Sequence, residues 1–164
     1  MSRFEETIIV DVPVRVAYDQ WTQFESFPRF MEGVERVEQV DDKTLRWTVD
    51  IAGKTNTWTA EITDQTPDTR IAWKSTEGAE NAGAVMFEPI GPTQTRVRLS
   101  LDAEPVGPLE TTGDALGFVK RRVHGDLERF KEHVHRKGAN GQGWRGEIDG
   151  DEVRPDPDEQ PPVH

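Results

Sequence analysis

The stretch that decides the fold reads LRWTVDI at positions 45–51 and, after a turn at Gly53, TWTAEIT at positions 57–63. Apolar and polar residues alternate on both sides of this turn, which is the period of a β-strand with one buried face. Two such strands, joined by a short turn, indicate neighbouring antiparallel strands that share an apolar face. Trp47 and Trp58 both lie on that predicted face.

The same alternation extends outward in both directions, from Val34 to about Asp102. Each alternating segment is short, and turn-forming residues separate it from the next one. These turns are predicted at Asp41-Asp42, Ala52-Gly53-Lys54, Pro67-Asp68, Gly78 to Asn81 and Gly91-Pro92. The pattern is typical of an antiparallel meander of five or six strands with one buried face.

After the meander the period changes to that of a helix. Residues 109 to about 137 carry one stripe of apolar side chains at spacings of three and four, and charged residues are expected on the opposite side. The stripe consists of Leu116, Val119, Val123, Leu127, Phe130 and Val134, and the charged side of Arg122, Asp126, Arg129 and Glu132. A long helix with one apolar stripe needs an apolar surface to cover, and the sheet offers one.

The residues before the meander predict a strand over Phe4–Val12, a helix over Val14–Phe24 that begins after Pro13, and a second short helix over Phe27–Met31. Together these elements predict an α+β fold in which a curved antiparallel sheet wraps around the long C-terminal helix. The two short helices after the first strand would close one end. Space left between such a sheet and its helix would suit a small ligand, for which pockets of about 300–1,000 Å³ are usual.

The sequence divides into a domain over residues 1–137 and a tail over residues 138–164. Gly and Pro are frequent in the tail, charge is high and apolar residues are sparse. Such a segment buries too little surface to offset the entropy of ordering it, so a disordered acidic tail is predicted. Trp144 is interpreted as an incidental aromatic residue within it, with a docking anchor as the alternative.

The composition argues against several classes of function. The chain has 164 residues, 20 Lys+Arg against 31 Asp+Glu, a net charge of -11 and no cysteine. Its acidity disfavours binding to nucleic acid, and the lack of cysteine rules out disulfides and thiolate sites. The N-terminal residues resemble no signal peptide, and no apolar run reaches the ~20 residues of a membrane span, which predicts a cytoplasmic protein without an integral membrane segment.

Motifs for metals and phosphates are also missing from the sequence. His133 and His135 are two positions apart on a predicted helix, so they face different sides and make a poor metal pair. There is no HExxH motif, no glycine-rich phosphate loop and no GxSxG motif. We therefore predict no metal site and no cofactor.

A series of segments also occurs in a recognisable order. These are VP at 12–13, FESFPRFMEGV at 24–34, LRW at 45–47, WTAEI at 58–62, RIAW at 70–73, GAVMFEP at 83–89, TRV at 95–97 and DLERFK at 126–131. Their joint order resembles the polyketide cyclase/dehydrase and coenzyme Q-binding type of the START-like (SRPBCC) superfamily, over roughly residues 3 to 137. The resemblance implies a helix-grip fold with a deep cavity, and apolar ligands such as lipids, polyketides or isoprenoid quinones. It implies no single activity.

Large apolar side chains are the candidates for binding such a ligand. Trp47, Trp58 and Trp73 come from three neighbouring predicted strands and share the buried face. With them we place Phe30, Met31 and Phe87. The same side chains would equally well fill a core without leaving a cavity, and the sequence favours neither alternative.

Catalysis would need a proton donor and an acceptor that face the cavity. Asn56 shares a face with Trp58, while Lys120 and His124 lie beside the apolar stripe of the long helix. The simpler interpretation places Asn56 at a strand end and both basic side chains in water. The leading hypothesis is therefore binding or transport of a hydrophobic small molecule. The alternatives are a polyketide cyclase/dehydrase, and an interaction or stress-related protein with a collapsed cavity.

Overall fold

The computed structural model describes residues 2–51, 53–78, 80–103, 113–137, 146–150 and 152–154. Its elements follow in the order β1 (Ser2–Val10), α1 (Val14–Trp21), η1 (Phe24–Arg29), β2 (Val34–Gln39), β3 (Thr44–Ile51), β4 (Lys54–Thr66), β5 (Arg70–Gly78), β6 (Asn81–Gly91), β7 (Gln94–Ala103), α2 (Gly113–Lys137), β8 (Glu147–Asp149) and β9 (Glu152–Arg154). The predicted meander corresponds to the six strands β2–β7.

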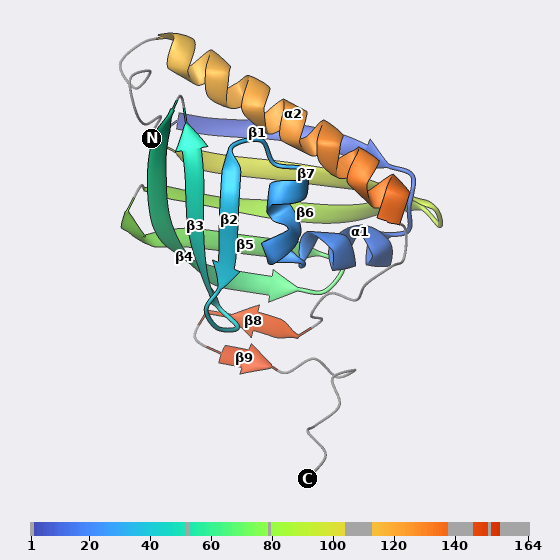
Figure 1. Ribbon diagram of the computed structural model, residues 1–164. Helices are drawn as coiled ribbons and strands as arrows, with labels where there is room; N and C mark the ends of the chain where they lie inside the picture. The colour runs from blue at the N-terminus through green and yellow to red at the C-terminus, as the bar shows by residue number, and fades with distance from the viewer. Residues whose placement is uncertain are drawn as a thin grey trace.

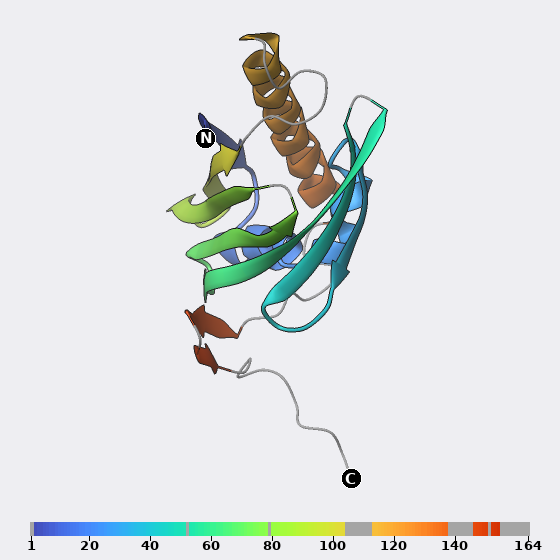
Figure 2. The ribbon, with the colours of Figure 1, turned by 90° about the vertical axis from the view of Figure 1, so that its left-hand side faces the viewer.

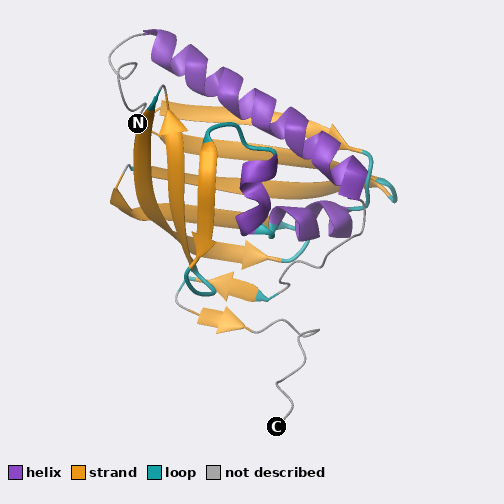
Figure 3. Cartoon of the chain, viewed as in Figure 1, coloured by secondary structure: helices purple, strands orange, loops and turns teal. Residues whose placement is uncertain are grey.

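One curved antiparallel sheet holds the strands together, in the order β1-β7-β6-β5-β4-β3-β2. Each strand of the meander pairs with the next along the chain, and β1 extends the sheet at its far edge by pairing with β7. The sheet bends so that α2 lies on its inner side, as two views at right angles show (Figures 1 and 2). The helices are segregated from the run of six consecutive strands β2–β7, as an α+β fold requires (Figure 3), which confirms that fold class.

The helical segment after β1 is divided differently from the prediction. α1 begins at Val14, directly after Pro13, whose missing N–H is not needed at a helix start. It ends at Trp21 rather than Phe24, because the Thr22 hydroxyl donates a hydrogen bond to the Asp19 carbonyl group at 2.9 Å and the chain then turns. A 3₁₀ helix, η1, follows over Phe24–Arg29 and contains Pro28. It begins three residues before the start of the predicted second helix, Phe27.

Helix α2 carries the predicted apolar stripe on its covered side. Val123, Leu127, Phe130 and Val134 are all buried. Residues 109–112 of the predicted helix, and the side chains of Leu116 and Val119, lie outside what the structure describes. No helix among the described residues is both long enough and apolar enough to cross a membrane.

A short C-terminal hairpin differs from the predicted disorder of residues 138–164. β8 pairs with the end of β4 through Asp64–Asp149 and Gln65–Ile148, and β9 pairs with β8. The reason is local: Ile148 is fully buried and joins the main core. Val153 of β9 is partly buried and packs against the same core. The low apolar content of the whole segment concealed these two residues. Trp144 and the remaining tail residues lie outside the described ranges.

Aromatic rings fill the end of the molecule where α1 and η1 meet α2. Trp21 lies edge-on against Phe27 and Phe130, with ring centroids 5.7 and 4.7 Å apart. Phe87 of β6 contacts both Trp21 and Tyr18 edge-on. These contacts make this end a closely packed core.

Candidate functional site

Some side chains of the inner face of the sheet are completely buried, and others are only half-buried. Val85 and Val97, beside the aromatic core, are completely buried. Along the same strands, Leu99 is only partly buried, and so are Trp47, Trp58 and Trp73 on the neighbouring strands. The large apolar side chains that face α2 are therefore not all fully covered. This half-buried surface, defined by Trp47, Trp58, Trp73 and Leu99, is the candidate binding face.

Two of its tryptophans form a stacked pair. Trp47 of β3 and Trp58 of β4 are directly opposite in the strand register. Their rings are nearly parallel, with centroids 5.7 Å apart and an interplanar angle of 11°. Trp47 also contacts Phe27 of η1 at a centroid distance of 5.6 Å. The stacked pair therefore connects the aromatic core with the half-buried face.

The third tryptophan is held by a glycine and an asparagine. Trp73 of β5 is opposite Gly83 of β6, and a methyl group on Gly83 would collide with the indole ring. The indole N–H donates a hydrogen bond to the Asn81 side-chain oxygen at 3.2 Å. The Asn81 backbone N–H in turn donates to the Ser75 hydroxyl group at 3.0 Å. These contacts hold the ring against Gly83 of β6 and satisfy its only polar atom.

The other predicted binding residues lie in two different environments. Phe30 and Phe87 are buried within the aromatic core, where Phe30 contacts Phe27, Phe130 and His133. Met31 is half-buried and packs against that core. The structure thus brings the tryptophans to the half-buried face and keeps the two phenylalanines beneath it.

The predicted catalytic candidates do not form one group. Lys120 is exposed. The half-buried Asn56 donates a side-chain hydrogen bond to the Lys54 carbonyl group at 3.2 Å, which is the strand-end role considered as its alternative. His124 is also exposed, but its Nδ1 lies 3.5 Å from Glu6 Oε2. Glu6 shares the inner face of β1 with Phe4 and Ile8, and its charge made it unexpected there.

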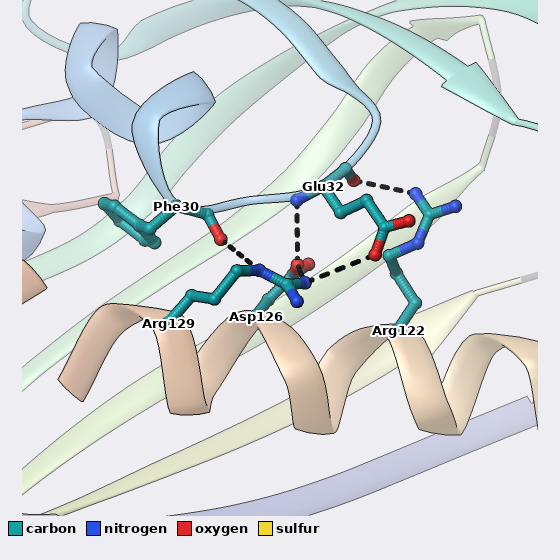
Figure 4. Close-up of polar contacts among 5 residues, drawn as sticks. All are labelled: Phe30, Glu32, Arg122, Asp126 and Arg129. Carbon is teal, nitrogen blue, oxygen red and sulfur yellow. Dashed lines mark hydrogen bonds and ion pairs between the residues drawn. The ribbon is translucent and has the colours of Figure 1, made fainter. Parts of the chain in front are cut away.

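A cluster of polar contacts, called the latch below, joins α2 to the loop between η1 and β2 (Figure 4). It consists of Arg122, Asp126 and Arg129 of α2 and of Phe30 and Glu32 of the loop. Arg129 donates from Nε to the Phe30 carbonyl group at 2.8 Å and from Nη2 to Asp126 Oδ1 at 2.6 Å. Asp126 Oδ1 also accepts the Glu32 backbone N–H at 3.0 Å, and Arg122 donates to the Glu32 carbonyl group at 2.7 Å. Arg122, Asp126 and Arg129 were predicted on the solvent side of the helix, yet they cross to this loop.

Burial changes the pKa of one carboxyl group in the latch, that of Asp126. Removal of the Asp126 carboxyl from water raises its pKa, although Arg129 and the Glu32 N–H act in the opposite direction. Gly33 follows the latch with φ of +84°, and a side chain there would collide with the Arg122 guanidinium. The latch therefore depends on a glycine at this position.

Sequence reasoning missed three polar residues that the topology places near the inner face: Glu6, Asn81 and Gln65. Only strand parity could have indicated Glu6, since it occupies an apolar position of the first strand. Across the part of the chain that the structure describes, no cluster of three or more His, Cys, Asp or Glu side chains is arranged to hold a metal ion.

Comparison with known proteins places this architecture among characterised folds. The family model described as polyketide cyclase / dehydrase and lipid transport matches residues 10–132. An uncharacterized 17.2 kDa protein from the melC2-rnhH intergenic region of Streptomyces lincolnensis is 49% identical over 149 residues, which are 90% of this chain and 99% of that protein.

Two solved structures show the same fold at lower identity. The Zhui aromatase/cyclase from Streptomyces sp. R1128 is 20% identical, with a TM-score of 0.69 over 85% of this chain and 98% of its own. A START superfamily protein from Mycobacterium smegmatis is 18% identical, with a TM-score of 0.67 over 82% of this chain and 97% of its own. At these identities the likeness concerns the fold, which is the helix-grip arrangement implied by the sequence resemblance.

Proposed function

Because this chain belongs to the polyketide cyclase/dehydrase and lipid transport family, we propose that it binds an apolar small molecule between its sheet and α2. The observation that carries the proposal is the half-buried state of Trp47, Trp58 and Trp73 on the inner face. When a ligand covers apolar surface that the fold leaves partly exposed, the free energy of binding becomes more favourable by about 25 cal/mol per Å².

The surface of the candidate binding face is apolar and suits an uncharged ligand. The stacked pair and Trp73 offer ring faces, and Trp73 has its indole N–H already bonded to Asn81. The chain as a whole has a net charge of -11, which repels anions. Lipids, polyketides and isoprenoid quinones are the ligand classes that we propose, each held mainly through apolar contact.

The test uses the neutral fluorescent probe N-phenyl-1-naphthylamine, whose emission rises in an apolar environment. We expect a Trp47→Leu/Trp58→Leu double variant to bind it at least about tenfold more weakly, since each replacement removes ring area worth about 1 kcal/mol. Ile9→Ala is the control, because Ile9 is an exposed apolar residue of β1. Equal affinity of a folded double variant and the native chain would reject the proposal.

A second candidate function is catalysis of a cyclisation or dehydration. One observation favours it: the inward-facing carboxylate of Glu6 lies 3.5 Å from His124 Nδ1, and a carboxylate–imidazole pair can hold and transfer a proton. Turnover of a linear poly-β-ketone should then fall at least about a hundredfold in both Glu6→Gln and His124→Ala. Lys120→Ala tests the remaining predicted base, and turnover that survives all three changes would exclude these residues from the mechanism.

A further inference from the structure

Gln65 is a buried amide without a structural partner. It lies on β4 and is only 1% exposed. Its register neighbours on the two sides are Ile71 of β5 and Ile148 of β8, which are buried to the same degree. Among the described residues, neither its side-chain nitrogen nor its side-chain oxygen has a hydrogen-bond partner.

Two other buried polar side chains show what a structural role looks like in this molecule. The Thr95 hydroxyl group donates to the Val12 carbonyl group at 2.9 Å, and the Thr22 hydroxyl group donates to the Asp19 carbonyl group. The first bond joins β7 to the segment that follows β1, and the second closes the end of α1. An amide that is left unpaired in an apolar core instead destabilises the fold by about 1–3 kcal/mol for each lost partner, so it suits a partner that comes from outside the chain.

The position of Gln65 connects it to the candidate binding face. Gln65, Ile71, Val85 and Leu99 are successive register partners across β4, β5, β6 and β7, so their side chains form one row on the inner face. Trp73 is two residues beyond Ile71 on the same strand, which separates the two rows by about 7 Å. The amide is thus one row nearer to the aromatic core than the half-buried indole of Trp73 is.

We propose that Gln65 is the internal polar anchor of the binding face and takes a neutral oxygen group at the leading end of an apolar ligand. The Nε2 group would donate to a ligand carbonyl, and Oε1 would accept from a ligand hydroxyl. A charged group is disfavoured there, because the surrounding isoleucines offer it no compensation for lost water. The ligand class is therefore an uncharged ring or chain compound with a terminal carbonyl or hydroxyl group. This inference rests on the proposed function.

The experiment compares naphthalene with 2-naphthol and 2-acetylnaphthalene, each displacing N-phenyl-1-naphthylamine from the full chain. The native chain is compared with Gln65→Met, which keeps the length of the side chain and removes both polar atoms. Gln65→Leu is the second variant, and Gln39→Met, at an exposed position of β2, is the matched control. Thermal unfolding without ligand is measured for all four proteins.

We expect Gln65→Met to weaken the two oxygenated probes about tenfold relative to naphthalene, and to raise the unfolding temperature of the ligand-free protein. Gln39→Met should change neither quantity. Unchanged relative affinities, or a lower unfolding temperature in both Gln65 variants, would overturn the anchor role while leaving the proposed function intact. If no probe binds the native chain, the proposed function itself fails.

Discussion

At the residue scale, Asp126 is a carboxylate in surroundings that oppose its charge. It accepts hydrogen bonds from Arg129 and from the Glu32 backbone N–H, yet burial still raises its pKa. The folded protein therefore holds this proton more tightly than the unfolded chain does. Its contribution to stability is present below the unfolded pKa and is lost as the pH rises through the raised folded pKa.

Asp126→Asn should remove this dependence, because an amide keeps an accepting oxygen and cannot ionise. We expect the free energy of unfolding of the native chain, relative to this variant, to fall as the pH rises from about 3 to about 7. Urea denaturation at a series of pH values measures it. Asp102→Asn is the control of opposite sign, since a hydrogen bond from Arg3 lowers the pKa of Asp102. A relative stability of Asp126→Asn that is constant with pH would contradict the argument.

Gly33 offers a second prediction at this scale. Gly33 and Gly53 have nearly equal backbone angles, with φ of +84° and +82°, but only Gly33 has neighbours within reach of a side chain. Gly53→Ala should lower the free energy of unfolding by about 1 kcal/mol through its backbone angle. Gly33→Ala should lower it by about 3 kcal/mol, because Arg122 and the Asp50 carbonyl group must also move. If chemical denaturation gave the same loss of unfolding free energy for both variants, Arg122 and the Asp50 carbonyl group would move without cost, which would contradict this prediction.

At the element scale, the strands were predictable and the attachments between elements were not. Alternation over 45–51 and 57–63 predicts two strands directly, because each side chain's face follows from position alone. The latch needed Arg129 to meet a carbonyl group 99 positions away, and no local pattern encodes that contact. The same limit applies to Gln65, whose unpaired state depends on neighbours from β5 and β8.

The C-terminal hairpin gives the prediction at this scale. Ile148 is fully buried against the core although it follows a segment rich in glycine. Ile148→Ala should lower the free energy of unfolding by about 2 kcal/mol, through lost burial and a residual cavity. Ile90→Ala, at an isoleucine that is 37% exposed, should change it by less than about 0.5 kcal/mol. Should Ile148→Ala prove as harmless as the control in urea denaturation, the hairpin would not be part of the cooperative fold.

At the scale of the whole molecule, α2 is tied near both edge strands of an open sheet. On the β1 side, the Asp11 backbone N–H donates to His135 Nε2 at 3.0 Å, and on the β2 side the latch holds Phe30 and Glu32. The long helix and the curved sheet were both foreseeable from periodicity. The half-buried state of the tryptophans was not, because side-chain volume alone does not decide between filling a space and lining it.

The pairing of β1 with β7 has a consequence for how the chain acquires its structure. Arg3 and Asp102 meet across these strands although 99 positions separate them, whereas within the meander each strand pairs with the next along the chain. Closing so large a loop is slow, so the first strand should join last. Val10→Ala should then mainly accelerate unfolding, while Val85→Ala should slow refolding, as stopped-flow kinetics would reveal. During synthesis, the first strand made would wait unpaired until the seventh has left the ribosome.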